Sequence, residues 1–313
     1  MYNRFLFFLI CPCCILYSGQ TDAQSGPSLA ARLGYPAGTK LLIIHADDLG
    51  VAHAQNQASF AALDSGPVNS ASIMVPCPWL EEVAAYARAN PGADLGLHFT
   101  LTSEWRFCKW GPVAPQNTVS SLVDSVGYFQ DNCDGMADRA LPEEAERELR
   151  AQIERAKKMG IEPTHFDTHM GCLYWTNLPL FNLYLKLGRE YKVPLRLGRN
   201  ALKALPEPFQ QAVNADDIVI DHIYSATPEN FQGGMTAYYE KVLHSMQPGV
   251  NEIVIHLAYD NTEMQGMTFD HPDWGAAWRQ ADFDFFTSEN CRKIMREEGI
   301  QTITWREVGK LLR

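Results

Sequence analysis

Continuous apolar runs alternate along this chain of 313 residues with segments in which apolar residues recur at helical spacing. The apolar runs predict buried strands, and the 3.6-residue repeat predicts amphipathic helices. We expect strands at 41–46, 70–75, 94–101, 164–169, 194–197, 218–220, 252–257 and 302–304. We expect helices at 54–64, 78–88, 142–159, 178–191 and 288–298, and an irregular segment at 103–138.

Strands that alternate with helices are typical of βαβ units and predict an α/β protein with a mainly parallel sheet. About seven strands in a chain of this length suit a single closed or nearly closed (β/α) barrel. No repeat or linker divides residues 24–313, so we expect one domain there. In such barrels the chemistry lies at the carboxyl ends of the strands, where polar residues should be sought.

The first 23 residues have a different character. Arg4 precedes an uncharged apolar stretch at 5–17, and the small residues Thr21 and Ala23 occupy the positions that a signal peptidase reads. We therefore expect a signal peptide cleaved before Gln24, with export to the periplasm or the extracellular space. The apolar stretch is shorter than the roughly 20 residues that span a membrane, so we expect no stable membrane insertion. Its three cysteines leave a lipoprotein form as the alternative.

Charge and cysteine content restrict the partners and the disulfides. A formal charge of −11 argues against nucleic acid or an anionic membrane as partner. Export permits disulfides, and after cleavage an odd number of thiols remains, so at least one is free. These thiols belong to Cys77, Cys108, Cys133, Cys172 and Cys291. Cys108 and Cys133 bracket a loop-like stretch, and we expect them to form a disulfide.

The most informative segment is 41–50, in which four apolar residues lead to His45 and the adjacent carboxylates Asp47 and Asp48. Burying an unpaired charge costs several kcal/mol or more, so two neighbouring carboxylates at a strand end need a cation or a shared proton. A metal ion is the simplest compensation. For the Asp-Asp pair alone, a helix cap is the alternative interpretation.

Further strands also end in polar side chains. His98 lies late in its predicted strand, and His256 ends another. His165, Asp167 and His169 alternate along one strand and so share a face. Two imidazoles and a carboxylate with open positions suit a catalytic zinc, with magnesium, manganese or cobalt as alternatives. We assign Asp48, His98 and His169 as the ligands of one such divalent ion.

This ligand set suggests hydrolysis. A bound divalent ion lowers the pKa of its water to about 7, which provides a nucleophile at neutral pH. Asp47 is the candidate base, and His256 is the candidate acid that protonates the leaving group. His45, His165 and Asp167 are expected to lie behind the ligands, although either histidine can equally be a hydrogen-bonded core residue.

Several motifs resemble those of the YdjC-like carbohydrate deacetylases, a family that includes the chitooligosaccharide deacetylases. They are His45-Ala-Asp-Asp-Leu-Gly with Asn56, Asn69-Ser-Ala-Ser-Ile-Met-Val, Gly96-Leu-His-Phe-Thr-Leu-Thr, Pro163-Thr-His-Phe-Asp-Thr-His and Glu252-Ile-Val-Ile-His. The resemblance runs from residue 41 to the C-terminus. It implies a distorted (β/α) barrel of the glycoside hydrolase/deacetylase type that uses a divalent metal to remove acetyl groups from amino sugars. The family's metal, base and late-histidine positions fall on the residues chosen above: Asp48, His98, His169, Asp47 and His256.

The chain also departs from the family pattern. His45 stands where members usually carry Asn, Gly171 where they carry another His, and Leu257-Ala258 where Pro-Gly follows. The metal set is unaffected, but the substrate side of the pocket can differ. Because many relatives are cytoplasmic, export of this chain also implies a different pool of acetylated oligosaccharides.

Aromatic residues offer candidate contacts for a sugar. The segment 103–138 holds Trp105, Phe107, Trp110 and Tyr128, whose rings can either stack on sugar faces or bury the loop. We take Trp105, Trp110 and Arg196 as candidate substrate-binding residues. Trp274 and Trp278 suggest the same role with less support.

Two other functions fit the same residues. The site can belong to a metallohydrolase of a non-sugar amide, ester or phosphoester, although few Arg or Lys residues lie near the motifs to hold a phosphate. The chain can also be a non-catalytic sugar-binding barrel, but such a protein would be expected to lose a ligand or the base, and all are present. The sequence is compatible with a monomer or a homodimer.

Overall fold

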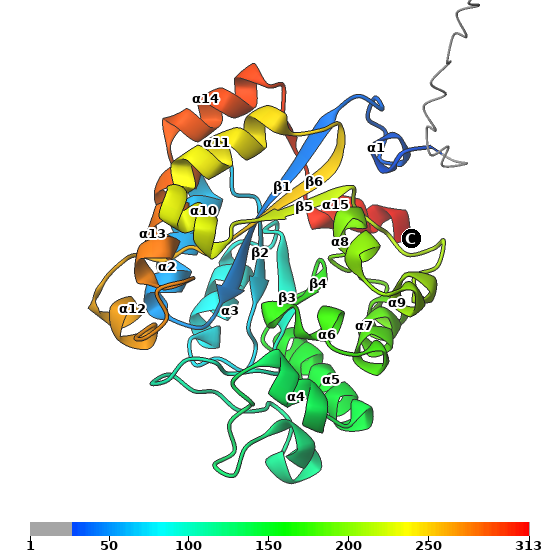
Figure 1. The fold of residues 1–313 in the computed structure, drawn as a ribbon, viewed down its shortest axis with the longest axis vertical. Helices are drawn as coiled ribbons and strands as arrows, with labels where there is room; N and C mark the ends of the chain where they lie inside the picture. Colours follow the sequence, from blue (N-terminus) through cyan, green and yellow to red (C-terminus); the bar gives the residue numbers. More distant parts are fainter. Residues whose placement is uncertain (1–26, 313) are drawn as a thin grey trace, which may run out of the picture.

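A computed structural model describes residues 27–312 as one curled parallel sheet surrounded by helices (Figure 1). The expected signal peptide, residues 1–23, and its cleavage site before Gln24 lie outside the described residues. The strands are β1 (Lys40–Leu49), β2 (Ser70–Ile73), β3 (Leu95–Phe99), β4 (Phe166–Thr168), β5 (His222–Ser225), β6 (Gly249–Ile255) and β7 (Gln301–Thr302). Their order is β4-β3-β2-β1-β6-β5, with β7 beside β1. The predicted α/β architecture is confirmed.

Sparse pairing continues the sheet from β4 toward β5. Isolated parallel bridges join Phe166 to Leu195 and Gly198 to Ile220. The segments 194–197 and 218–220, which we expected to be strands, therefore contribute only single bridges. The arc of paired strands thus curls into a distorted barrel instead of closing through regular ladders.

Helices cover the outside of this sheet (Figure 1). The longer ones are α2 (His53–Ser65), α3 (Leu80–Ala89), α5 (Pro142–Lys158), α7 (Leu178–Tyr191), α11 (Met235–Ser245), α13 (Ala276–Phe286) and α14 (Glu289–Glu297). The shorter ones are α1 (Leu29–Arg32), α4 (Cys133–Arg139), α6 (Cys172–Trp175), α8 (Arg199–Ala204), α9 (Glu207–Ala212), α10 (Pro228–Gly233), α12 (Thr262–Met267) and α15 (Trp305–Val308). Four 3-10 turns, at Gln116–Thr118, Ser120–Leu122, His169–Gly171 and Gly309–Leu312, complete the elements.

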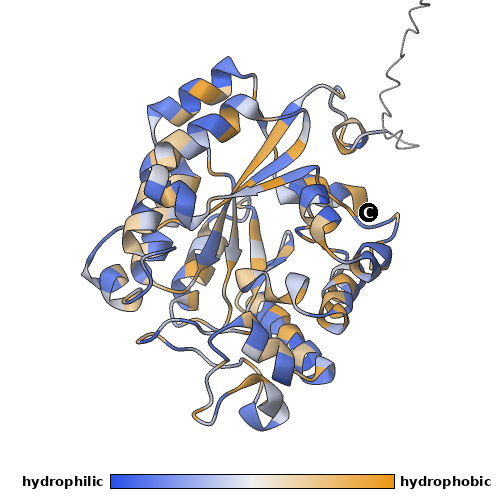
Figure 2. Cartoon of the chain, in the orientation of Figure 1, coloured by the Kyte–Doolittle hydropathy of each residue, from blue (hydrophilic) through white to orange (hydrophobic). Residues whose placement is uncertain are grey.

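The central strand β1 is buried on both faces. Leu42 and Ile44 join the large apolar cluster formed with the surrounding helices. Leu41 and Ile43 join a smaller cluster that includes Trp305 of α15. Figure 2 accordingly shows long hydrophobic stretches on the central strands and mixed colouring on the helices. A strand packed on both sides has to be apolar throughout, which explains the run that begins the sequence motif.

The one disulfide among the described residues differs from our expectation. Cys133 of α4 bonds to Cys172 of α6, whereas Cys108 is free. The prediction of a Cys108–Cys133 bridge was therefore wrong. Bracketing a loop says only that two cysteines are near in sequence, whereas a bridge needs their Cα atoms close in space. Here α4 lies against the turn after β4, and the Cα atoms of Cys133 and Cys172 are 5.0 Å apart.

A search of residues 27–312 finds no helix that is both long and apolar enough to cross a membrane.

Candidate metal centre and cavity

A bulge at the end of β1 turns two adjacent carboxylates toward one place. Neighbouring side chains on a regular strand point to opposite faces. The pairing of β1 with β2 shifts by one residue between Ala46 and Leu49, and Asp48 has a left-handed backbone with φ of 71°. Such a bulge locally breaks the alternation. Asp47 and Asp48 consequently both line the same cavity.

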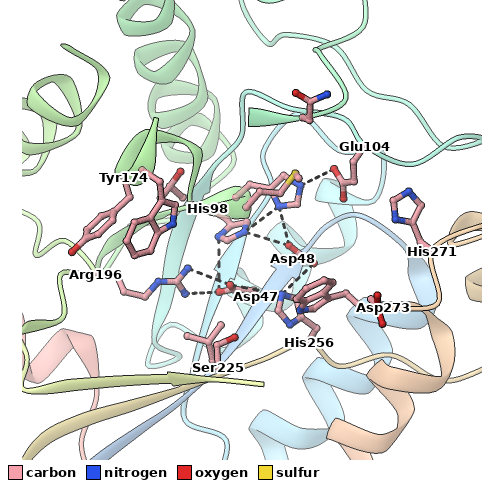
Figure 3. Close-up of a pocket in the computed structure, with 18 of the residues that line it drawn as sticks. Asp47, Asp48, His98, Glu104, Tyr174, Arg196, Ser225, His256, His271 and Asp273 are labelled. Atoms are coloured by element: carbon pink, nitrogen blue, oxygen red, sulfur yellow. Dashed lines mark hydrogen bonds and ion pairs between the residues drawn. The ribbon is translucent and has the colours of Figure 1, made fainter. Parts of the chain in front are cut away.

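Three ligand-type atoms form a nearly equilateral triangle beside this bulge (Figure 3). Asp48 Oδ1 lies 3.3 Å from His98 Nε2 and 3.4 Å from His169 Nδ1, and the two nitrogens are 3.3 Å apart. Tetrahedral bonds of about 2.0–2.1 Å to zinc place ligand atoms about 3.3–3.4 Å from one another. Asp48 Oδ1 is buried and has no hydrogen-bond partner among the described residues. The spacing and the unsatisfied oxygen fit a divalent ion.

Each of the three side chains is held from behind by a charged partner. His98 Nδ1 lies 2.7 Å from Asp167 Oδ1, and His169 Nε2 lies 2.9 Å from Glu104 Oε2. Arg279 Nη2 donates to the second oxygen of Asp48 at 2.8 Å. Carboxylates behind imidazole ligands fix the ring orientation and make the ligands more basic. This arrangement leaves Nε2 of His98 and Nδ1 of His169 directed at the triangle.

Asp47 does not belong to the triangle and is held differently. Its Oδ1 accepts from Arg196 Nη1 at 2.7 Å and lies 3.0 Å from His45 Nε2. Although burial raises it, the guanidinium of Arg196 and the imidazole of His98 hold the pKa of Asp47 well below its usual range. Asp47 Oδ2 has only a longer contact with Arg196, at 3.2 Å. Asp47 is therefore an ionised carboxylate whose Oδ2 is the less engaged oxygen.

His256 follows the end of β6 and faces both carboxylates. Its Nε2 lies 4.0 Å from Asp47 Oδ2 and 4.0 Å from Asp48 Oδ2. Burial lowers the pKa of His256 to about 4, against the pull of the Asp48 charge. The imidazole is thus neutral at neutral pH.

The three residues expected behind the ligands lie there at different depths. Asp167 contacts His98 directly, and His45 Nε2 lies 3.1 Å from Asp167 Oδ2. His165 is one step further away: its ring packs on Trp305, and its buried Nε2 finds no partner in the described part of the chain. Burial holds the pKa of His165 well below its usual range, so it is a neutral core residue.

The triangle opens into a cavity of about 720 Å³ at the carboxyl ends of the strands. Trp105 lines it but is only 3% exposed, because it packs against Trp110 and under the guanidinium of Arg279. Trp110 is equally buried and is not among the residues that line the cavity. Its expected role in substrate binding stays a prediction. Arg196 lines the cavity, with its guanidinium bound to Asp47 and Asp167.

Sequence reasoning missed several residues at this site. Glu104 lies five positions beyond the end of β3, so a search just past each strand end would have found it. Arg279 lies on a helix that we did not predict and is 231 residues from Asp48 in the chain, so no local pattern indicates the pairing. His271 and Trp175 also line the cavity.

Fold and site together define an α/β barrel protein with an aspartate–histidine cluster at the carboxyl ends of its strands. The model of the YdjC-like protein family matches residues 41–297. The chain belongs to this family.

Relatives and a solved structure agree with this assignment. A carbohydrate deacetylase from Thermus thermophilus is 33% identical over 292 residues, which cover 91% of this chain and 99% of the relative. A carbohydrate deacetylase from Brevibacillus brevis is 29% identical, covering 86% and 99%. A crystal structure of an Enterococcus faecalis V583 protein, provisionally described as a cellobiose-phosphate cleavage protein, superposes with a TM-score of 0.72 at 27% identity, covering 86% and 99%.

Proposed function

We propose that this protein is a metal-dependent hydrolase that removes acetyl groups from a carbohydrate, with an N-acetylated amino sugar as the preferred substrate. Relatives named carbohydrate deacetylases, aligned over most of both chains, support the reaction. The observation that carries the metal dependence is the triangle of Asp48 Oδ1, His98 Nε2 and His169 Nδ1, with edges of 3.3–3.4 Å.

A divalent ion held by these three atoms supplies a Lewis acid and lowers the pKa of water. Zinc fits the two imidazoles best, and magnesium, manganese and cobalt are the alternatives. Negative charge favours a cation here, because Asp48 and Asp167 are buried and the partly buried Glu104 lies directly behind His169.

Asp47 accepts the proton of the attacking water in this proposal. Its low pKa keeps it ionised, and its Oδ2 is the oxygen that faces the cavity side of the site toward His256. Arg196 and His45 hold the opposite oxygen and so fix the direction of the carboxylate.

His256 protonates the leaving nitrogen. The ring is neutral before the reaction. The proton that it gives to the leaving nitrogen would therefore be the one that Asp47 takes from water, passed from Asp47 Oδ2 to His256 Nε2. Its position 4.0 Å from Asp47 Oδ2 places it at the same reacting centre as the residue that removes a proton from water. The two groups therefore serve opposite proton transfers within one cycle.

We further propose that the protein acts outside the cytoplasm after cleavage of residues 1–23. The apolar stretch near the N-terminus suits a signal peptide. The Cys133–Cys172 disulfide supports this proposal, because disulfides persist mainly in oxidising compartments.

The test is release of acetate from N-acetylated and O-acetylated sugars by purified protein, before and after chelation and after return of each candidate metal. We expect activity to disappear with chelation and to return with metal. Asp47→Asn should retain stoichiometric metal but lose turnover, whereas Asp216→Asn, at an exposed site, should behave as wild type. Activity that survives complete metal removal would refute metal dependence. Sugar binding without acetate release would instead indicate a non-catalytic barrel.

A further inference from the structure

We propose that Trp175 and Trp274 select the saccharide by stacking on sugar rings on opposite sides of the reacting one. The substrate would then be an uncharged oligosaccharide, and single sugars and phosphorylated sugars would be poor substrates. This inference rests on the proposed function, because it assumes that a carbohydrate enters the cavity. It does not depend on which metal the ligands hold.

The two indoles belong to opposite walls of the cavity. Trp175 ends α6, next to Tyr174, whereas Trp274 follows Asp273 in the loop between α12 and α13. Figure 3 shows Tyr174 on one side of the metal-ligand cluster and Asp273 on the other. Both indoles line the cavity and are unusually accessible for tryptophan, with exposed fractions of 52% for Trp175 and 39% for Trp274. A large, rigid ring with one accessible face is suited to contact a sugar.

The position of Trp175 depends on a glycine. A Cβ atom at Gly171 would lie 2.1 Å from Nε1 of Trp175, so the indole lies over residue 171 and no side chain fits beneath it. Gly171 also has a φ of 71°, a left-handed conformation that glycine adopts readily. The neighbouring ring of Tyr174 packs edge-on against Trp175. Because Gly171 follows the ligand His169 by two residues, the same turn places the ligand and the indole.

The backbone of Trp274 is strained in a way that places its ring. Its φ is 56°, a left-handed conformation that is unfavourable for a bulky L-residue. The carbonyl of Trp274 accepts a hydrogen bond from Arg279 Nε at 2.6 Å, and its ring stacks on Trp278. Arg279 also donates to Asp48, so one guanidinium connects this wall to the metal ligands. Strained backbone conformations that surrounding contacts maintain, like that of Trp274, occur mainly at active sites and ligand-binding sites.

The charges of the cavity exclude anionic sugars. Carboxylates of Glu104, Asp131 and Asp273 line it in addition to those at the triangle. No lysine lines the cavity within the described part of the chain, and its two arginines are committed: Arg196 to Asp47 and Asp167, and Arg279 to Asp48. A phosphate or carboxylate on a sugar would meet these carboxylates and would find no lysine or uncommitted arginine of the cavity to pair with.

The test measures kcat and KM for N-acetylglucosamine, its β-1,4-linked dimer and tetramer, and N-acetylglucosamine 6-phosphate. Trp175→Ala and Trp274→Ala should each raise KM for the tetramer about tenfold, the loss expected for one aromatic contact, with kcat within about twofold. KM for the monosaccharide should change little. Trp79→Ala is the matched control, because Trp79 is 40% exposed but lies outside the cavity lining. The 6-phosphate should neither react nor compete.

Two further variants separate stacking from folding. Trp175→Phe keeps an aromatic face and should retain most of the affinity. Gly171→Ala should raise KM by displacing the indole, and adding it to Trp175→Ala should have no further effect on KM. Unchanged KM in Trp175→Ala, or a wild type that uses monosaccharide and tetramer equally well, would overturn the inference.

Calorimetric titration of Asp47→Asn with the tetramer distinguishes the two proposals. If the tetramer binds and Trp175→Ala weakens that binding, but no sugar releases acetate in the wild type, the proposed function fails and the stacking role stands. If acetate is released but neither binding nor KM responds to the tryptophans, the function stands and this inference fails.

Discussion

Replacing Arg279 by methionine tests how the cluster is held together. The side chain is 2% exposed, and its guanidinium donates to Asp48 Oδ2 and to Gln55 Oε1, each at 2.8 Å. Methionine keeps much of the apolar stem but leaves the buried carboxylate of Asp48 without its cation. We expect the variant to fold, but with a loss of stability larger than that caused by removing a surface ion pair.

The magnitude follows from the burial of both partners. Removing one partner of a buried ion pair costs about 3–5 kcal/mol, because the remaining charge is uncompensated. For a chain of this size each kcal/mol lowers the melting temperature by about 1.6 °C, so a fall of roughly 5–8 °C is expected. Arg106→Met is the matched control: its contact with Asp270 is 2.6 Å long, but both side chains are more than half exposed. Exposed pairs contribute about 1 kcal/mol or less.

Urea denaturation should be measured with chelator and with added zinc. A divalent ion also neutralises Asp48, so the deficit of Arg279→Met should be smaller with zinc than with chelator. A loss below about 1 kcal/mol, equal to that of Arg106→Met, would refute the structural role given to Arg279. An equal deficit in the two conditions would contradict the idea that the guanidinium and the ion stabilise the same carboxylate.

Three further outcomes are expected. Asp167→Asn should weaken metal binding about 10–100-fold, measured by competition with a chelating dye, because His98 loses the carboxylate that orients it. Cys172→Ser should lower the free energy of unfolding by about 2–4 kcal/mol by removing the bond to Cys133, and a reductant should lower the stability of the wild type but not of the variant. Burial raises the pKa of Glu148 to about 7. The carboxyl of Glu148 therefore holds its proton more tightly in the folded protein than in the unfolded chain. This protonation contributes fully to the stability of the fold below about pH 4.5, and its contribution is lost as the pH rises through 7. Wild type should therefore lose more stability than Glu148→Gln between pH 5 and pH 8 in denaturant titrations.

The alternation of apolar runs and helical repeats predicted most of the barrel because those patterns reflect local burial. It located β1, β3 and β6 and the helices α5 and α7 to within a few residues. It missed β5, whose residues are only partly buried and so do not form an apolar run. It also missed α11 and α13, although each of them buries several apolar side chains.

The proposed ligands could be predicted from the sequence because the carboxyl ends of the strands in a parallel barrel meet at one edge. Asp48 follows an apolar run, His98 lies late in a predicted strand and His169 ends the alternating segment 165–169, and the structure brings the three together. The residues that contact the ligands from behind could be predicted only where they belong to the same predicted strand as a ligand, as Asp167 does. Arg279 and the partner of Cys133 are set by tertiary packing between distant segments, which no local pattern records.

The bulge in β1 makes the length of that strand as important as its composition. One surplus residue between Ala46 and Leu49 is what lets consecutive side chains share a direction. Shortening the strand there by a single position would restore strict alternation and send one of the two carboxylates outward into the helical layer. Deleting Ala46 or Leu49, which would retain both aspartates, should thus abolish the site, whereas conservative exchanges nearby leave the geometry intact.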